Sequence, residues 1–434
     1  MCGGVKSKLM NPRTQNNASN AMNFGSSTGN NNKNNSNAAV PFFDYQLIAT
    51  TIMDKKMKEY ITIEEVTRGY MDCKRRKGST DDCARYSEDW VSNNIKLWRE
   101  LNDMTYEVGP SRAFCVTRPK LREVFCAQFR DRVVHHIVVN HFLDLLEGEM
   151  IEDAYACRKG MGTLYGARRM AEQMERVTQG YTREAWTMTC DLQGFFMSID
   201  RMMLYGMLRE IIEKKYDGGN TEWWLWLWKK IITNAPERNC HRTGDTYLWN
   251  YLPKNKSLFT SGGKGLPIGN LPSQVLANLL LAGFDKWMRF RLGDGGYGRY
   301  VDDFVCIHTD KGLLLETARM ARVWLRENLG LTMHPRKFIL QRADKGITFA
   351  GTTIKPGRTY PSRRAVDGLF KWIKDYNEMR VGKEDLCTHF DSYMGHLAHH
   401  DSYSVRRRAW ASIEDKQGLM CTNMRKLRAI AKTA

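Results

Sequence analysis

Three aspartates are the residues of this sequence best suited to chemistry. Asp302 and Asp303 are adjacent in the tetrapeptide at 300–303, and Asp191 lies about 110 residues upstream. Carboxylate oxygens are hard ligands, so three of them together suit two Mg²⁺ ions, with Mn²⁺ as an alternative. Such a metal pair activates an attacking hydroxyl and stabilises the leaving oxygen of an in-line displacement at phosphorus. The three acids therefore indicate nucleotidyl transfer.

The elements around these acids must bring them together. Residues 185–190 alternate as a strand does and lead into Asp191, while residues 298–308 predict a hairpin with the acid pair at its turn. A turn is needed because successive side chains of an ideal strand point to opposite faces. An isolated Asp-Asp pair is usually a surface turn, and we interpret Asp81-Asp82 in that way. The ordered set is thus more specific than any of its members.

The remaining pattern predicts an α+β fold. In chain order we expect strands within 113–124, a helix at 130–146, a glycine-rich loop at 261–269, a helix from its cap Ser273 to 291, a helix at 311–328, strands at 338–340 and 348–350, and helices from 361 onward. Four tryptophans within 221–232 are predicted to pack in a local insertion rather than to stack on bases.

The composition favours a polyanionic partner. Lysine and arginine number 66 against 48 acidic residues, and the formal net charge of +18 suits nucleic acid. Apolar runs are far shorter than the roughly 20 residues of a bilayer span, and the N-terminus lacks the apolar core of a signal peptide. We therefore expect a cytoplasmic protein with no membrane partner. The 11 cysteines include no CxxC pair, which favours free thiols. His135, His136 and His141 are predicted to pack rather than to bind metal.

Three segments resemble the A, B and C motifs of reverse transcriptases, in that order. They read Asp-Leu-Gln-Gly-Phe-Phe-Met-Ser-Ile-Asp at 191–200, Gly-Leu-Pro-Ile-Gly-Asn-Leu-Pro-Ser-Gln at 265–274 and Tyr-Val-Asp-Asp at 300–303. Residues 337–351 resemble the D and E motifs that follow. The resemblance spans about residues 110–410. It implies an RNA-directed DNA polymerase with the right-hand architecture of fingers, palm and thumb.

This architecture implies a division of the chain. We expect a disordered, asparagine-rich extension at 1–41, N-terminal helices and fingers at 42–184, a palm with an antiparallel sheet at 185–360, a fingers or insertion segment within the palm at about 205–262, and a helical thumb at 361–434. The extension has too few apolar residues to fold alone.

The resemblance also implies roles for individual residues. Asp191, Asp302 and Asp303 would be catalytic and would hold the metal ions, together with the carbonyl of Leu192. Phe196 matches a bulky residue beneath the sugar, where an aromatic ring collides with a ribose 2′-OH and so favours deoxynucleotides. The other implied nucleotide-binding residues are Lys120, Arg122, Ile268, Gly269, Gln274 and Lys337. Arg130, Arg132, Arg158 and Lys159 match positions near the template, Ile268 also bears on fidelity, and Tyr300 matches a position adjacent to the primer.

One departure within the B motif narrows the resemblance. Group II intron and retron enzymes usually carry Gln-Gly and Ser-Pro there, whereas this sequence has Ile268-Gly269 and Ser273-Gln274. The departure is similar to the reverse transcriptases of diversity-generating retroelements, which copy a template RNA with frequent errors at adenines and so diversify a target gene. That group implies four partners, namely the template RNA, the cDNA product, dNTPs and a small basic accessory variability determinant protein.

Two other interpretations remain open. One is another bacterial reverse transcriptase, of the phage-defence or retron-like kind, which would use the same acids. The other is an RNA-binding scaffold that has lost catalysis, and the intact Asp191, Asp302 and Asp303 argue against it.

Overall fold

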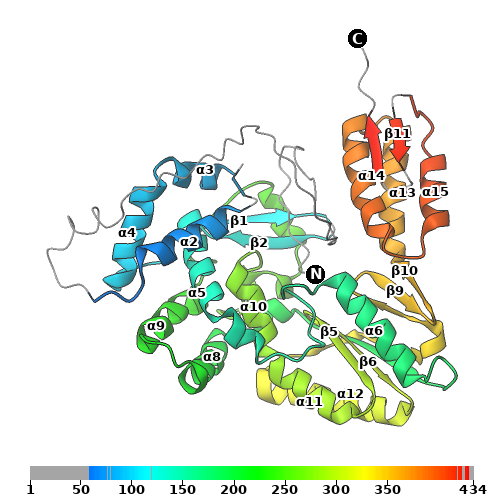
Figure 1. Ribbon diagram of the computed structural model, residues 1–434, viewed down its shortest axis with the longest axis horizontal. Coiled ribbons are helices and arrows are strands. Elements are labelled where there is room, and N and C mark those ends of the chain that lie inside the picture. The colour runs from blue at the N-terminus through cyan, green and yellow to red at the C-terminus, as the bar shows by residue number, and fades with distance from the viewer. Residues whose placement is uncertain are drawn as a thin grey trace, which may run out of the picture. The chain divides into compact units, whose positions relative to one another are not determined.

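A four-stranded antiparallel sheet forms the centre of the fold (Figure 1). Its strands, in spatial order, are β5 (Gly296–Tyr300), β6 (Asp303–His308), β3 (Trp186–Leu192) and β7 (Met333–Arg342). The predicted hairpin and the strand before Asp191 are therefore confirmed. The computed structural model describes residues 58–75, 77–78, 80–118, 120–417, 419–422 and 426–429, so the extension predicted at 1–41 lies outside the described residues. All elements below belong to one unit, whose described part begins at Tyr60.

Helices cover both faces of this sheet. Helix α6 (Thr163–Val177) packs on β5 and β6 from one side, and α11 (Ala282–Leu292) and α12 (Lys311–Leu329) pack from the other. The alternation of β5 explains the arrangement, because Tyr297 and Arg299 bond to α11 while Gly298 faces α6. A Cβ atom on Gly298 would lie 2.3 Å from Met170 Sδ, so a residue without a side chain lets α6 come this close.

A second, three-stranded sheet and a group of helices are formed mostly by residues that precede β3. The strands are β1 (Ser111–Val116), β2 (Arg122–Cys126) and β4 (Cys240–Arg242), and the helices are α2 (Ile63–Lys74), α3 (Asp81–Glu88), α4 (Trp90–Asn102) and α5 (Phe129–Glu147). The strands predicted within 113–124 and the helix at 130–146 are confirmed. The interpretation of Asp81-Asp82 as a surface turn is wrong. The pair opens α3, because acidic side chains in a first turn interact favourably with the helix dipole.

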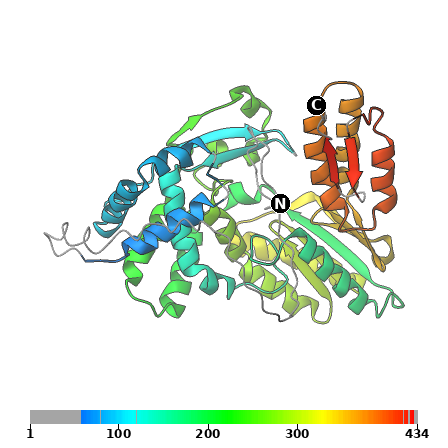
Figure 2. The ribbon, with the colours of Figure 1, turned by 45° about the horizontal axis from the view of Figure 1, so that its top comes forward.

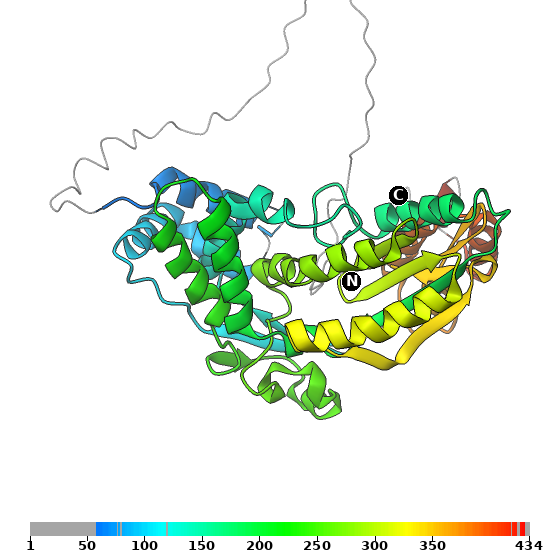
Figure 3. The same ribbon diagram turned by 90° about the horizontal axis from the view of Figure 1, so that it is seen from below.

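The tryptophan-rich segment is a buried helix. Helices α8 (Arg201–Lys215) and α9 (Thr221–Thr233) pack side by side (Figure 3). Trp223, Trp224 and Trp228 are buried, and the Trp223 Nε1–H donates to the Leu101 carbonyl at 2.9 Å. The prediction that the tryptophans pack rather than stack on bases is confirmed for these three. Residues 245–261, here called the insertion, follow and contain η1 (Thr246–Tyr251), η2 (Lys254–Lys256) and η3 (Leu258–Thr260).

The helix after the glycine-rich loop begins earlier than predicted and is broken in two. Helix α10 (Leu271–Leu280) has Asn270 at its N-cap position, with no side-chain capping hydrogen bond, and is followed by α11. Ser273 lies buried inside the first turn, so its predicted role as the cap is wrong. The physical reason is Pro272. Proline lacks an N–H and has a helical φ, so it fits the first turn and places the cap before it.

The C-terminal helices have a core of their own. A small sheet of β8 (Ile347–Phe349), β9 (Thr352–Lys355) and β10 (Arg358–Pro361) leads to α13 (Arg363–Asn377), α14 (Lys383–Leu397) and α15 (Tyr403–Ala411). Leu369, Phe390 and Met394 are fully buried in that core. The prediction of helices to the end of the chain is wrong. An antiparallel pair, β11 (Leu419–Thr422) and β12 (Lys426–Ala429), lies against these helices (Figure 2), and four residues per strand are too few for a clear alternating pattern.

Two expectations from the sequence concern the state of the cysteines and the length of apolar helices. The ten cysteines within the described ranges are all free thiols, as predicted. None of the helices that the structure describes is long and apolar enough to cross a bilayer.

Candidate active site

Backbone pairing brings the three predicted aspartates together. Asp191 near the end of β3 is paired with Asp303 at the start of β6. The Leu192 N–H donates to the Asp302 carbonyl at 3.2 Å, so the two acid-bearing segments are joined next to the side chains themselves. The predicted carboxylate site is therefore formed by adjacent strands of one sheet.

The negative charges of Asp191, Asp302 and Asp303 repel one another. Burial, and then the nearby Asp191 carboxylate, raise the pKa of Asp302 above its ordinary value. Burial, the charge of Asp302 and the hydrogen bond with Asp191 likewise raise the pKa of Asp303. Closely spaced carboxylates lose this penalty when a cation neutralises them. In the structure Lys337 supplies positive charge, with its Nζ donating to Asp191 Oδ2 at 2.5 Å.

The donor set fits a divalent metal ion. No three His, Cys, Asp or Glu side chains in the described part of the chain already stand as a metal cluster. The chemistry of Asp191, Asp302 and Asp303 nevertheless matches hard cations, which prefer carboxylate and carbonyl oxygen. These three side chains, with the Leu192 carbonyl, would hold it. A metal bound there supplies Lewis-acid stabilisation of charge at phosphorus and lowers the pKa of an attacking hydroxyl.

The turn between β5 and β6 is strained. Val301 has φ 60°, in the left-handed region, which is rare for a β-branched residue. Such a conformation costs on the order of 1–3 kcal/mol and persists where the surroundings impose it. The turn lets Asp302 and Asp303 follow one another without the alternation of a regular strand. Tyr300, just before it and predicted to lie beside the primer, is buried, with 3% of its surface exposed.

A comparison with known protein families shows which family this chain belongs to. Residues 117–354, more than half of the chain, match the family described as "Reverse transcriptase (RNA-dependent DNA polymerase)". The chain belongs to the reverse transcriptase family. Below, the central sheet is called the palm, the β1–β2 region the fingers and helices α13 to α15 the thumb, which are the names given by the division of the chain predicted above. The matched segment includes Asp191, Asp302 and Asp303.

Individual relatives are distant. Protein YkfC of Escherichia coli (strain K12) is 22% identical over 305 residues, which cover 62% of this chain and 73% of YkfC. An apo telomerase of Candida tropicalis truncated from its C-terminal domain has a TM-score of 0.44 at 10% identity, covering 63% of this chain and 60% of that one. A Candida albicans telomerase in complex with a fragment of telomeric RNA has a TM-score of 0.40 at 11% identity, covering 76% and 60%. The reverse transcriptase thus spans only 60% of either telomerase chain.

The fold gathers the cations predicted for nucleotide binding. The pKa of Lys120 is lowered, first by partial burial and then by Lys337, Arg364, Lys256 and Arg122, in that order. Lys120, Arg122 and Lys337 were expected there from the sequence. Lys256 of the insertion and Arg364 of the thumb were missed. We call these five residues the cation cluster. Lys337 belongs both to this cluster and to the carboxylate site, so the two are adjacent.

The predicted gate and fidelity residues lie against one apolar group. Phe196 and Ile268 both pack on the buried cluster of Ala113, Phe125, Met197 and Leu258. Phe196 is half-buried, whereas Phe195 is 2% exposed and belongs to the core. The Phe125 N–H donates to the Ile268 carbonyl at 2.9 Å, which ties the B-motif loop to the fingers strand β2. Phe196 and Ile268 are therefore positioned by the same small core.

The neighbours of Ile268 have structural reasons of their own. Gly269 has φ 119°, and a Cβ atom there would lie 2.8 Å from the Phe125 carbonyl oxygen, so this position needs glycine. Gln274 is half-buried, and its Oε1 accepts from Cys157 Sγ at 3.5 Å. The Gln274 side chain thereby joins α10 to the loop that carries Arg158 and Lys159.

The predicted template residues divide into two kinds. Arg158 donates to the carbonyls of Ile151 and Ala154 at 2.7 and 3.0 Å, so it supports its own loop. Lys159 is exposed beside it. Arg130 is ion-paired with Glu100, and Arg132 lies 3.7 Å from Asp82. In this structure Arg130, Arg132 and Arg158 have acidic or carbonyl partners within the protein, and Lys159 projects from it.

A buried acid attaches the insertion to the fingers. Glu123 on β2 is 1% exposed. Its carboxylate accepts from Trp249 Nε1 at 2.6 Å, from Ser257 Oγ at 2.7 Å and from the Leu258 N–H at 2.7 Å. Nothing in the sequence distinguishes this glutamate from an exposed one, because all three donors are more than 120 residues away. It holds Lys256 of the cation cluster close to β2.

Proposed function

We propose that this reverse transcriptase copies a template RNA into cDNA with errors directed to adenines, and so diversifies a target gene. The observation that carries the proposal is the side chain at Ile268. It is half-buried on the apolar cluster that also receives the predicted sugar gate Phe196. A glutamine there could hydrogen-bond near the nascent base pair, whereas isoleucine offers only an apolar face. Fewer polar constraints reduce discrimination between correct and incorrect nucleotides.

The proposed reaction uses the carboxylate site and the cation cluster together. Asp191, Asp302 and Asp303 would hold two Mg²⁺ ions, or Mn²⁺, and such ions would stabilise the charge that develops when the primer 3′-hydroxyl attacks the α-phosphorus of the incoming dNTP and pyrophosphate leaves. Lys120, Arg122 and Lys337 receive the triphosphate, because ammonium and guanidinium groups form charge-assisted hydrogen bonds with phosphate. Lys256 and Arg364 extend that set.

The proposed sugar selection and template contacts follow from the same geometry. Phe196 blocks a ribose 2′-OH and thereby selects deoxynucleotides, and Gly269 and Gln274 shape the pocket beside it. Lys159 contacts the template backbone, and Arg130 and Arg132 lie on the fingers side of the template, where Arg130 exchanges its partner Glu100 for RNA. The basic accessory protein and the retroelement template RNA are further proposed partners.

The test of adenine-directed error is a substitution at Ile268. The purified chain, its candidate RNA and the accessory protein are supplied with Mg²⁺ and dNTPs, and the cDNA is sequenced. Ile268→Gln should lower misincorporation opposite template adenine by about tenfold, since one well-placed hydrogen bond is worth roughly 1.4 kcal/mol. Ile268→Leu is the matched control, because it keeps an apolar side chain and should keep the errors.

Two results would contradict the proposal. Unchanged adenine errors in active Ile268→Gln would remove the role of Ile268. Accurate copying of adenine by the natural sequence would leave a reverse transcriptase of another bacterial kind, phage-defence or retron-like, and would exclude the diversifying function.

A further inference from the structure

A buried ion pair lies next to the catalytic turn. Arg299 on β5 and Asp285 on α11 are 1% and 0% exposed at their side chains. The Arg299 Nε and Nη2 donate to the two carboxylate oxygens of Asp285, each at 2.7 Å. Burying an ion pair costs the hydration free energy of both charges. Replacing a whole buried ion pair by apolar side chains of similar size often causes no loss of stability. A contribution to stability is therefore a weak explanation for its presence here.

The same guanidinium reaches the strained turn. Arg299 Nη1 donates to the Val301 carbonyl at 2.8 Å and to Asn278 Oδ1 at 3.1 Å. Val301 is the residue with φ 60°, and its carbonyl immediately precedes Asp302. Asn278 belongs to α10, and its Nδ2 donates to the Ala156 carbonyl at 2.5 Å. One planar, always charged group thus connects α10, α11 and the turn that carries the acid pair.

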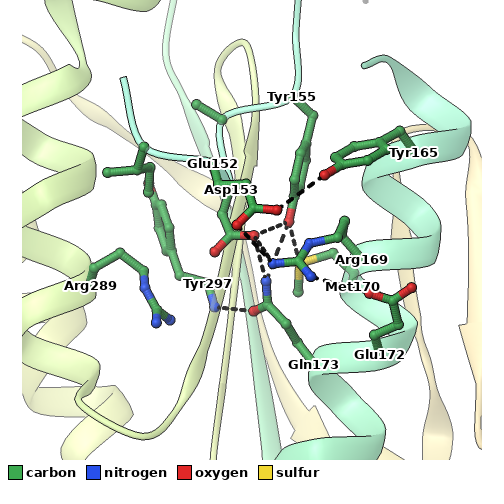
Figure 4. A network of polar contacts seen from close by, with 12 residues as sticks. Glu152, Asp153, Tyr155, Tyr165, Arg169, Met170, Glu172, Gln173, Arg289 and Tyr297 are labelled. Atoms are coloured by element: carbon green, nitrogen blue, oxygen red, sulfur yellow. Dashed lines mark hydrogen bonds and ion pairs between the residues drawn. The ribbon is translucent and has the colours of Figure 1, made fainter. Parts of the chain in front are cut away.

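The opposite face of β5 is fixed as well (Figure 4). The Tyr297 N–H donates to Gln173 Oε1 at 2.7 Å, and Gln173 Nε2 donates to Asp153 Oδ1 at 2.8 Å. The Tyr297 hydroxyl crosses to the other side and donates to Asp285 Oδ1 at 2.7 Å. Strand β5 is therefore held by side-chain hydrogen bonds from α6 and α11. Its position before the turn is fixed, and the hydrogen bond from Arg299 to Val301 extends that constraint into the turn.

We propose that Arg299 is a positioning residue for the metal-binding carboxylates, held in place by Asp285. Its hydrogen bond to the Val301 carbonyl keeps the left-handed turn formed, and the turn sets where Asp302 and Asp303 present their oxygens. The inference rests on the proposed metal-dependent transfer at those carboxylates. It adds residues that contact neither metal nor nucleotide, and it predicts that weaker divalent-cation binding accompanies their loss.

The test removes both charges at once, so that neither is left buried and unpaired. The two-site variant Arg299→Met with Asp285→Asn keeps an acceptor for the Tyr297 hydroxyl and loses the bond to Val301. Arg299→Lys is the conservative variant, because its single ammonium retains a charge for Asp285 but lacks the fork that also reaches Val301. Arg176→Met is the matched control. Arg176 donates to the Asp294 and Gly295 carbonyls at 2.7 and 2.9 Å, which lie at the other end of β5.

The measurements are Mn²⁺ affinity by electron paramagnetic resonance, steady-state primer extension and thermal unfolding. For the two-site variant we expect weaker Mn²⁺ binding and a fall in kcat on the order of a hundredfold, since small displacements of catalytic groups cost about that much. KM for dNTP should be unchanged. Arg299→Lys should fall between that variant and the natural sequence, and Arg176→Met should retain both Mn²⁺ affinity and kcat.

Two results would overturn the inference. One is unchanged Mn²⁺ affinity and kcat in a folded two-site variant. The other is a loss of thermal stability with normal kcat per folded molecule, which is what a merely structural pair would give. If the two-site variant fails to fold, Arg299→Lys decides by the same readouts. Mn²⁺ binding is measured without polymerisation, so it decides on Arg299 even where the proposed copying activity fails.

Discussion

The palm and the fingers handle charge in opposite ways. In the palm, Arg299 and Asp285 are almost completely buried and hydrogen-bonded to one another. At the fingers, the Lys120 side chain is largely exposed. Its pKa is lowered first by partial desolvation and then by the positive charges around it. The buried ion pair beside the catalytic turn thus holds opposite charges in a fixed arrangement. The cation cluster holds like charges together, and such charges gain most when a polyanion binds between them.

This difference indicates which part of the site is formed in advance. The carboxylates lie on paired strands next to a turn that Arg299 contacts, so their positions depend little on substrate. The long lysine side chains of the cation cluster can move, and a triphosphate would bring the charge that orders them. Substitutions in the two regions should therefore affect different kinetic constants, and the first two predictions below follow from that expectation.

The largest effect is expected from the palm carboxylates. Asp303→Asn should reduce primer extension by a factor on the order of a thousand or more, because metal stabilisation of the transferred phosphoryl group is worth several kcal/mol. Thermal stability should be kept or increased, since the substitution removes a charge that repels Asp302 and Asp191. Asp217→Asn, at an exposed loop residue, is the control. Retained activity in Asp303→Asn would contradict the assignment of the metal ligands.

A smaller effect is expected from the cation cluster. Lys120→Ala and Lys256→Ala should each raise KM for dNTP by about tenfold with little change in kcat, because each removes one charge-assisted contact with phosphate. The increase should shrink as salt is added, since exposed charges are screened. Lys214→Ala is a matched control, as Lys214 is an exposed lysine paired with Glu210 on α8. A fall in kcat at unchanged KM would show that the cluster is fixed in the same way as the palm.

The last prediction concerns the stability of the fingers and no kinetic constant. Burial, and then His136, lower the pKa of His135 from 6.5 to about 3, so His135 is neutral in the folded protein. The unfolded chain binds a proton below about pH 6.5 and the folded chain does not, so stability falls as pH decreases from 6.5 toward 3. Between pH 7 and pH 5 this should cost about 2 kcal/mol.

Thermal unfolding at several pH values measures that loss. His135→Leu should flatten the dependence, whereas His241→Gln, at an exposed histidine, should not. An equally steep decline in His135→Leu would assign the effect to other groups, with His136 first among them, since burial also lowers its pKa to about 4.

The catalytic hairpin could be predicted from sequence because its signals are local. Strand-like segments flank the acid pair at 302–303, and the strand before Asp191 alternates clearly. The ordered motifs indicate that Asp191 and the acid pair share one site, and the structure pairs Asp191 with Asp303 on adjacent strands. The prediction of Ser273 as the cap is wrong for an equally local reason, because Pro272 lies in the first turn and the N-cap position therefore falls on Asn270.

The parts that could not be predicted depend on contacts between distant segments. Arg289, Arg291 and Arg299 stand within eleven residues, and nothing in that run marks the last of them as buried. Lys256 and Arg364 join Lys120 only because the insertion and α13 fold back toward β2. Contacts between residues more than a hundred positions apart leave no periodic pattern in the sequence. Lys256 and Arg364 can therefore be assigned to the cation cluster only from the folded structure.

The attachment of the insertion has a consequence for how this enzyme could change over time. Glu123 binds three donors of the insertion, and two residues later the same strand binds the Ile268 carbonyl. A change in residues 245–261 can therefore be transmitted to Ile268 without altering any residue proposed to hold metal. If Ile268 has its proposed role in fidelity, natural variation in this segment offers a route to adjust the error rate gradually while the carboxylate site stays constant.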